Sequence, residues 1–159
     1  MVNKYGWVDT GSSFLPSEVN CAFLYAQLES LDVIQNRRKA IWNQYHEGLK
    51  VLAERGFFSL PDMPDYATNN AHMFYLVCRN LDERTGLIKY LKEHDVLSVF
   101  HYLSLHKSEF YTSHNTDIPN LPLCDMYADC LVRLPMFYEL TLEQIDEIVR
   151  LIFSFFQEQ

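Results

Sequence analysis

The sequence predicts an α+β domain in which helices pack on a short sheet of about three strands and a helical arm comes first. Two observations predict this class. Apolar residues recur at intervals of three, four and seven in several segments, which is the spacing of amphipathic helices. Three short runs between those segments are rich in branched and aromatic residues, as strands are. The chain has 159 residues with a hydrophobic content of 48%, which is enough to bury one core.

The arm is the first predicted helix, which begins at Pro16 and Ser17 and runs to about Ser30. The serine hydroxyl can accept a hydrogen bond from an unpaired amide of the first turn. Apolar residues surround most of this helix instead of forming one stripe, so it needs neighbours on several sides, and the chain offers few. We therefore expect the arm to be the least secure part of the isolated chain and to dock on another copy.

The second predicted helix is long and has a single core face. That face is formed by Ile34, Ile41, Trp42, Tyr45, Leu49 and Leu52. Gly56 is suited to end the helix, and the turn-rich stretch from Ser59 to Asn70 is expected to be a loop.

Three strands and two further helices complete the predicted domain. The strands are His72 to Arg79, Val96 to Tyr102 and Cys130 to Met136. A helix from Asp82 to His94 separates the first two strands, and a capping box made by Thr141 and Gln144 starts the last helix. Between the second and third strands, the stretch from His101 to Leu123 has no clear periodicity. An ordered loop of that length in a compact domain is often functional.

Composition excludes several classes of protein. A balance of 13 Lys+Arg against 21 Asp+Glu gives a net charge of -8, which repels nucleic acid. The apolar stretches are shorter than the roughly 20 residues of a membrane helix, and no leader pattern is seen, so we expect no membrane partner and a cytoplasmic protein. The four cysteines form no CxxC pair and are expected to be reduced, and no metal site is expected.

Two groups of residues are candidates for chemistry. His101, Tyr102 and His106 open the long loop directly after a strand, where imidazole and phenol groups can bond a sugar or phosphate or move a proton. Alternatively, these side chains cap the strand and pack the loop. Ser12 and Ser13 lie in a turn before the first helix, which favours an anion such as phosphate, although ordinary capping explains them as well. The sequence has no Walker, Rossmann, HExxH or Ser-His-Asp pattern.

Four segments, in order, resemble nucleotide-sugar aminotransferases of the DegT/StrS type: KYGWVDTGSSF with the helix that follows it, NNAHMFYLVC, VFHYLSLH and LVRLPMFYELT. The resemblance covers nearly the whole chain. It implies the fold of type I pyridoxal-phosphate enzymes, of which this chain matches the C-terminal portion. Residues 1–32 are then expected to end the large domain and dimer-interface segment, and residues 33–159 to form the C-terminal small domain.

The resemblance also implies an activity and its partners. The complete protein is expected to be a homodimer that uses pyridoxal 5'-phosphate to transfer an amino group from glutamate to a dTDP-4-keto-6-deoxyhexose, as in surface polysaccharide or lipopolysaccharide biosynthesis. Ser13, with Ser12, is expected at the cofactor phosphate of the neighbouring subunit, and His106, with Tyr102 and His101, at the nucleotide sugar. No catalytic residue is assigned, because the cofactor-binding lysine of the family lies upstream of the matched part. The isolated chain is therefore expected to be inactive.

Two other functions stay open on the sequence alone. A related pyridoxal-phosphate enzyme can catalyse transfer to the 3-position or a dehydration instead. The chain can also be a free-standing, non-enzymatic binding domain.

Overall fold

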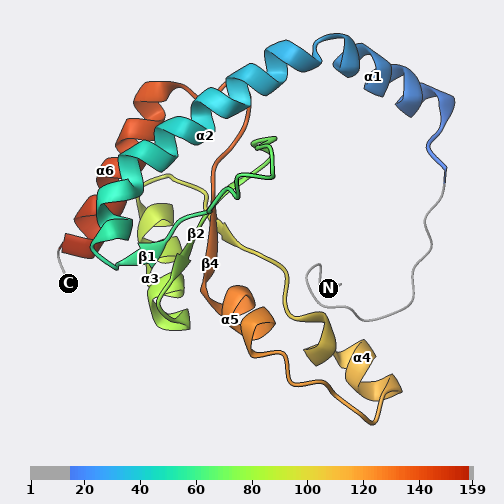
Figure 1. The fold of residues 1–159 in the computed structure, drawn as a ribbon, viewed down its shortest axis with the longest axis vertical. Coiled ribbons are helices and arrows are strands. Elements are labelled where there is room, and N and C mark those ends of the chain that lie inside the picture. Colours follow the sequence, from blue (N-terminus) through green and yellow to red (C-terminus); the bar gives the residue numbers. More distant parts are fainter. Residues whose placement is uncertain (1–14, 158–159) are drawn as a thin grey trace.

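The computed structural model describes residues 15–157, which form a helical arm followed by an α+β layer (Figure 1). In chain order the elements are α1 (Glu18–Glu29), α2 (Leu31–Glu54), β1 (Phe58–Ser59), β2 (Phe74–Cys78), α3 (Leu81–Glu93), β3 (Val99–Phe100), the 3-10 helix η1 (Leu105–Lys107), α4 (Glu109–His114), α5 (Pro122–Cys130), β4 (Leu131–Leu134) and α6 (Leu142–Gln157). The predicted α+β class is confirmed.

The arm, α1, stands away from the rest of the layer, beyond the end of α2 (Figure 1). Ser17 caps it as predicted, because its hydroxyl accepts from the amide of Asn20 at 3.3 Å. None of its residues is buried, and even Phe23 is 71% exposed. The described part of the chain therefore supplies no neighbours for this apolar helix, as the sequence indicated.

The sheet has the order β1-β2-β4-β3, and every neighbouring pair is antiparallel. Alternate side chains lie on opposite faces. Leu76 and its partner Val132 are fully buried on the face that packs on α2 and α6, which we call the core face. Arg133, opposite Tyr75 on one side and Val99 on the other, is half-buried on the second face, which we call the open face.

Helices α2 and α6 pack against each other over the core face. Tyr45 of α2 and Ile152 of α6 have no exposed surface. A methyl group at Gly48 would lie 3.0 Å from Val149 Cγ2, so glycine permits the close approach of the two helices. The hydroxyl of Tyr45 donates to the Pro135 carbonyl at 3.1 Å, and burial raises the pKa of this phenol.

The boundaries of several elements follow the predicted signals. Gly56 ends α2 with a φ of 81°, in the left-handed region that favours glycine. Thr141 and Gln144 form the predicted capping box: the amide of each donates to the side chain of the other, at 3.0 and 3.2 Å.

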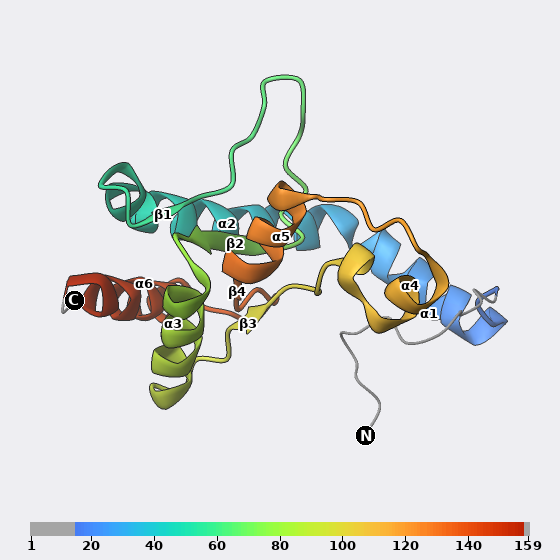
Figure 2. The same cartoon turned by 90° about the horizontal axis from the view of Figure 1, so that it is seen from below.

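The structure differs from the prediction in three places. The sheet has four strands, not about three, because the two-residue β1 pairs with β2 at the edge. The predicted strand from Val96 to Tyr102 shortens to β3, since the chain pairs with β4 only at Val99 and Phe100. The predicted long loop contains η1 and α4, and its last residues begin α5, in which Pro122 occupies the first turn. By contrast, the segment between β1 and β2 is a loop that extends away from the sheet (Figure 2).

Candidate functional site

The first predicted site lies where the chain leaves β3 toward η1. His101 is half-buried, and its ring lies 5.2 Å from that of Tyr102 in an edge-to-face arrangement. Nδ1 of His101 is buried and has no hydrogen-bond partner within the described residues. Burial lowers the pKa of His101, and the nearby positive charge of Arg133 lowers it further. This imidazole is therefore biased toward the neutral form.

A pocket of about 250 Å³ lies between this segment and α5. Its lining residues are His101, Tyr102, Leu103, Ser104, Leu105, Cys124, Tyr127, Ala128 and Leu131. The hydroxyls of Tyr102 and Tyr127 and the imidazole of His101 can hydrogen-bond a polar ligand, while the leucine and alanine side chains exclude water.

His106 has a different environment from the other two predicted residues. Only 5% of it is exposed, and it is not among the residues that line the 250 Å³ pocket. Its Nε2 lies 3.3 Å from Asp125 Oδ1 in α5, although the angle does not meet hydrogen-bond geometry. The structure thus brings His101 and Tyr102 together at the pocket, whereas His106 is buried beside Asp125 and does not line it.

Asp125 connects the loop to α5 through several contacts. Its Oδ1 accepts from the Ser104 hydroxyl at 2.9 Å, and its Oδ2 lies 2.7 Å from Lys107 Nζ. The hydrogen bond from Lys107 and that from Ser104 lower the pKa of Asp125, and the nearby His106 adds to the effect. A single carboxylate therefore holds both ends of the segment Ser104–Lys107. No local sequence pattern marks Asp125, because its partners lie about twenty residues earlier in the chain.

A second polar cluster, also not predicted, lies at the start of β2. Ala71 has a φ of 49°, in the left-handed region, which costs roughly 1–2 kcal/mol for a residue other than glycine. The Asn69 side chain accepts from the Ala71 amide at 2.7 Å, and Nε of Arg38 donates to the Ala71 carbonyl at 3.0 Å. Arg38 Nη2 also donates to the carbonyl of His72. Side chains from two segments thus hold this strained backbone in place.

The orientation of His72 is fixed by its neighbour. Asn70 Oδ1 accepts from the His72 amide at 3.2 Å and lies 2.9 Å from His72 Nδ1. Because a backbone N–H can only donate, the Asn70 atom is the oxygen, and Nδ1 must carry the proton. Nε2 is then an acceptor in the neutral ring.

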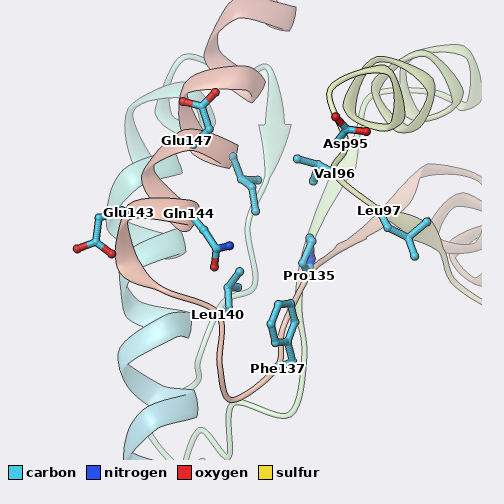
Figure 3. A pocket seen from close by; sticks show the side chains of 10 residues that line it. Asp95, Val96, Leu97, Pro135, Phe137, Leu140, Glu143, Gln144 and Glu147 are labelled. Carbon is cyan, nitrogen blue, oxygen red and sulfur yellow. The ribbon is translucent and has the colours of Figure 1, made fainter.

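A larger pocket, of about 620 Å³, is lined mainly by apolar side chains (Figure 3). It lies between the chain after α3 and the first turns of α6, and Val96, Pro135, Phe137 and Leu140 form its walls. The carboxylate of Glu143 points away from the space between Leu140 and Pro135 (Figure 3). Asp95, Gln144 and Glu147 also line this pocket, so its surface is apolar with a few polar groups.

The described residues do not provide an enclosed site for a pyridoxal-phosphate cofactor. Each of the five lysines between residues 15 and 157 is exposed, whereas covalent binding of that cofactor uses an amine activated by desolvation. Ser12 and Ser13, the predicted phosphate ligands, lie outside the described residues. Within the same range, no three His, Cys, Asp or Glu residues are grouped so that they could hold a metal ion. No helix there is both long and apolar enough to cross a membrane.

Three solved structures that this chain resembles belong to longer proteins. S. venezuelae DesV, solved in complex with a ketimine intermediate, is similar with a TM-score of 0.78 and 23% identity over 96% of this chain. Helicobacter pylori PseC, an aminotransferase involved in the biosynthesis of pseudoaminic acid, has a TM-score of 0.77 and 16% identity over 98% of this chain. An aminotransferase from Brucella abortus has a TM-score of 0.74 and 23% identity over 96%. This chain covers 40%, 44% and 41% of their respective lengths, which is less than half of each.

One protein-family model matches most of the chain. The model of the DegT/DnrJ/EryC1/StrS aminotransferase family matches residues 2–153. The likeness to the solved structures, each under 25% identical, shows the shared fold, and the family match extends over the arm, the sheet and α6 alike. The chain therefore belongs to the DegT/DnrJ/EryC1/StrS aminotransferase family.

Proposed function

We propose that this chain is the C-terminal portion of a pyridoxal-phosphate-dependent aminotransferase that acts on a sugar nucleotide. The observation that carries the proposal is the family match over residues 2–153. The chain spans less than half of the solved proteins it resembles, so we place the cofactor lysine in a part of the protein outside this chain. When bound, pyridoxal phosphate would supply the electron sink that amino transfer needs.

The finer assignment follows the resemblance of KYGWVDTGSS to dTDP-4-amino-4,6-dideoxygalactose transaminases. On this basis the donor is glutamate, the acceptor is a dTDP-4-keto-6-deoxyhexose, and the enzyme is a cytoplasmic homodimer in surface polysaccharide biosynthesis. Residues 1–32 would belong to the large-domain and interface segment, and residues 33–159 to the small domain. The exposed apolar surface of α1 is consistent with such an interface.

The residues of this chain would act by binding and positioning the substrate. His101 and Tyr102 border the 250 Å³ pocket and are proposed to hydrogen-bond the nucleotide sugar. His106 is proposed to serve the same cleft, and its contact with Asp125 gives it a role in holding the loop. Ser13, with Ser12, is proposed to donate to the cofactor phosphate across the dimer interface.

The test is an assay of the complete protein with pyridoxal phosphate, glutamate and either a 4-keto or a 3-keto dTDP-6-deoxysugar. We expect 2-oxoglutarate and an amino sugar from the 4-keto substrate alone. Product from the 3-keto sugar only, or dehydration without amino transfer, would contradict the assignment. The isolated chain should show no transamination above that of free cofactor, and turnover at one of its own lysines would show that the placement of the cofactor lysine is wrong.

The site residues are tested by two substitutions in the complete dimer. His106→Ala should change kcat or KM for the sugar nucleotide, and unchanged values of both would remove His106 from the site. Ser13→Ala should weaken retention of pyridoxal phosphate by roughly ten- to hundredfold, the effect of one hydrogen bond to a charged acceptor. Unaltered retention in the Ser12/Ser13 double alanine variant would leave these serines as a helix cap.

A further inference from the structure

A pocket of about 270 Å³ on the open face of the sheet joins the strained start of β2 to the central strand β4. Its lining residues are His72, Met73, Leu97, Val99, Arg133, Leu134, Pro135 and Met136. Two of these eight side chains are polar, His72 and Arg133, and the others are apolar. The volume is just below the range of about 300–1,000 Å³ that is usual for drug-sized ligands, so the pocket suits a small molecule or one end of a larger one.

Arg133 brings an uncompensated positive charge to this pocket. One terminal nitrogen donates to the Phe100 carbonyl at 3.3 Å, but Nε is buried and has no hydrogen-bond partner. Arg133 takes part in no ion pair within residues 15–157, and no described carboxylate lines the pocket. After burial, the charge of Arg133 is the second cause that lowers the pKa of His101. A buried guanidinium donor without a partner requires an acceptor, and the fork of Arg suits a carboxylate or phosphate.

His72 supplies the complementary group. Its Nδ1–H is engaged by Asn70 Oδ1 at 2.9 Å, so Nε2 is the ring nitrogen that remains for a ligand, as an acceptor in the neutral ring. The backbone that carries it is held by Arg38 and Asn69 in a conformation that alanine rarely adopts. Strained backbone that is fixed by several side chains occurs preferentially at ligand sites.

We propose that this pocket binds an oxyanion that carries a hydrogen-bond donor beside it. Arg133 holds the carboxylate or phosphate oxygens, and His72 Nε2 accepts from a neighbouring ammonium or hydroxyl group. Two ligand types combine these groups: an α-amino acid such as the amino donor, and a sugar nucleotide with its phosphates and hydroxyls. The choice of these two ligands depends on the proposed function, whereas the site itself depends only on the residues that form it.

The experiment is an NMR titration of the isotope-labelled 159-residue chain, without cofactor. The probes are L-glutamate, glutarate, which lacks the ammonium group, and dTDP-glucose. We expect saturable shifts at His72, Met73 and Arg133, with a Kd on the order of 1 mM for a small ligand held by a few polar contacts. Shifts with glutamate would identify the bound oxyanion as the carboxylate of an amino acid. Shifts with dTDP-glucose alone would identify it as the phosphate of a sugar nucleotide.

Variants test the assigned roles. Arg133→Gln should weaken binding by roughly ten- to hundredfold, as expected for loss of a charge-assisted hydrogen bond. Arg150→Gln removes the same charge at an exposed site on α6 and should bind like the wild type. His72→Phe removes the acceptor nitrogen and should weaken glutamate binding more than glutarate binding. If Arg133→Gln does not fold, Arg133→Lys replaces it, and weaker binding is expected because lysine lacks the planar fork.

Three outcomes would overturn the proposal: no saturable shift with any probe at concentrations on the order of 10 mM, equal binding by the Arg133 and Arg150 variants, or shifts outside the pocket only. These results are separate from the assay of the complete enzyme. If the complete enzyme transaminates but the chain binds none of the probes, only the pocket proposal is refuted. If the chain binds a probe but the complete enzyme does not transaminate, only the proposed function is refuted.

Discussion

Arg38 is expected to be the main support of the strained turn before β2, and Arg38→Met tests this. Its guanidinium donates to the carbonyls of Ala71 and His72, thirty-three and thirty-four residues away. Each net hydrogen bond contributes about 1 kcal/mol, and loss of the partner leaves the carbonyl of Ala71, a residue only 1% exposed, without this donor. We expect the free energy of unfolding to fall by about 2–3 kcal/mol. Methionine has nearly the helix propensity of arginine, so α2 itself should not weaken.

The assay is urea unfolding followed by circular dichroism. With a slope of about 2 kcal/mol per molar urea, the midpoint should fall by roughly 1 M. Lys39→Met is the matched control, because it removes the same charge from an exposed position next to Arg38 and should change stability by less than about 0.5 kcal/mol. If the two variants unfold at the same midpoint, the carbonyl contacts of Arg38 do not hold the turn.

Two further predictions concern titratable groups. Because the pKa of Asp125 is lowered in the folded chain, chiefly by the hydrogen bond from Lys107, its contribution to stability is present above the ordinary pKa of about 3.9 and is lost as pH falls through the lower folded value. Asp125→Asn should therefore lower the urea midpoint at pH 7, and most of this decrease should disappear at acid pH. Asp129→Asn, which changes an exposed carboxylate on the same helix, should leave the midpoint unchanged at both pH values. An equal decrease for Asp125→Asn at both pH values would contradict the predicted pH dependence. Burial raises the pKa of the Cys78 thiol to about 12, so its alkylation at pH 8 should be roughly a thousandfold slower than that of an ordinary exposed thiol. Mass spectrometry of iodoacetamide-treated protein checks this against the exposed Cys124, and rates within tenfold of each other would count against it.

The sequence predicted best those features whose signals are local. The core face of α2 follows from its spacing, and Ile41, Tyr45 and Leu49 are fully buried as expected. The capping box at Thr141 needs only residues three apart. Strand β1 could not be predicted, because two residues carry no periodicity and pair only once the sheet is assembled.

The missed polar residues share one physical reason, which is that their partners are distant in sequence. Arg37 and Arg38 occupy the polar positions of an amphipathic helix, which usually face water. In the structure, Arg37 donates to the carbonyls of Tyr138 and Leu140, about a hundred residues away. The spacing of residues along the sequence does not predict a contact between segments so far apart. The same is true of Asp125, whereas His101 and Tyr102 were proposed from the sequence because they follow a strand directly.

The two faces of the sheet differ in how the buried polar atoms beside them are paired. On the core face, Leu76 and Val132 are fully buried among apolar neighbours. On the open face, Nδ1 of His101 and Nε of Arg133 are buried and have no hydrogen-bond partner within the described residues. Buried polar atoms without a hydrogen-bond partner reduce stability, so proteins retain them mainly at functional sites. This contrast supports our proposal that the open face, from the start of β2 across β4 to the end of β3, binds a ligand.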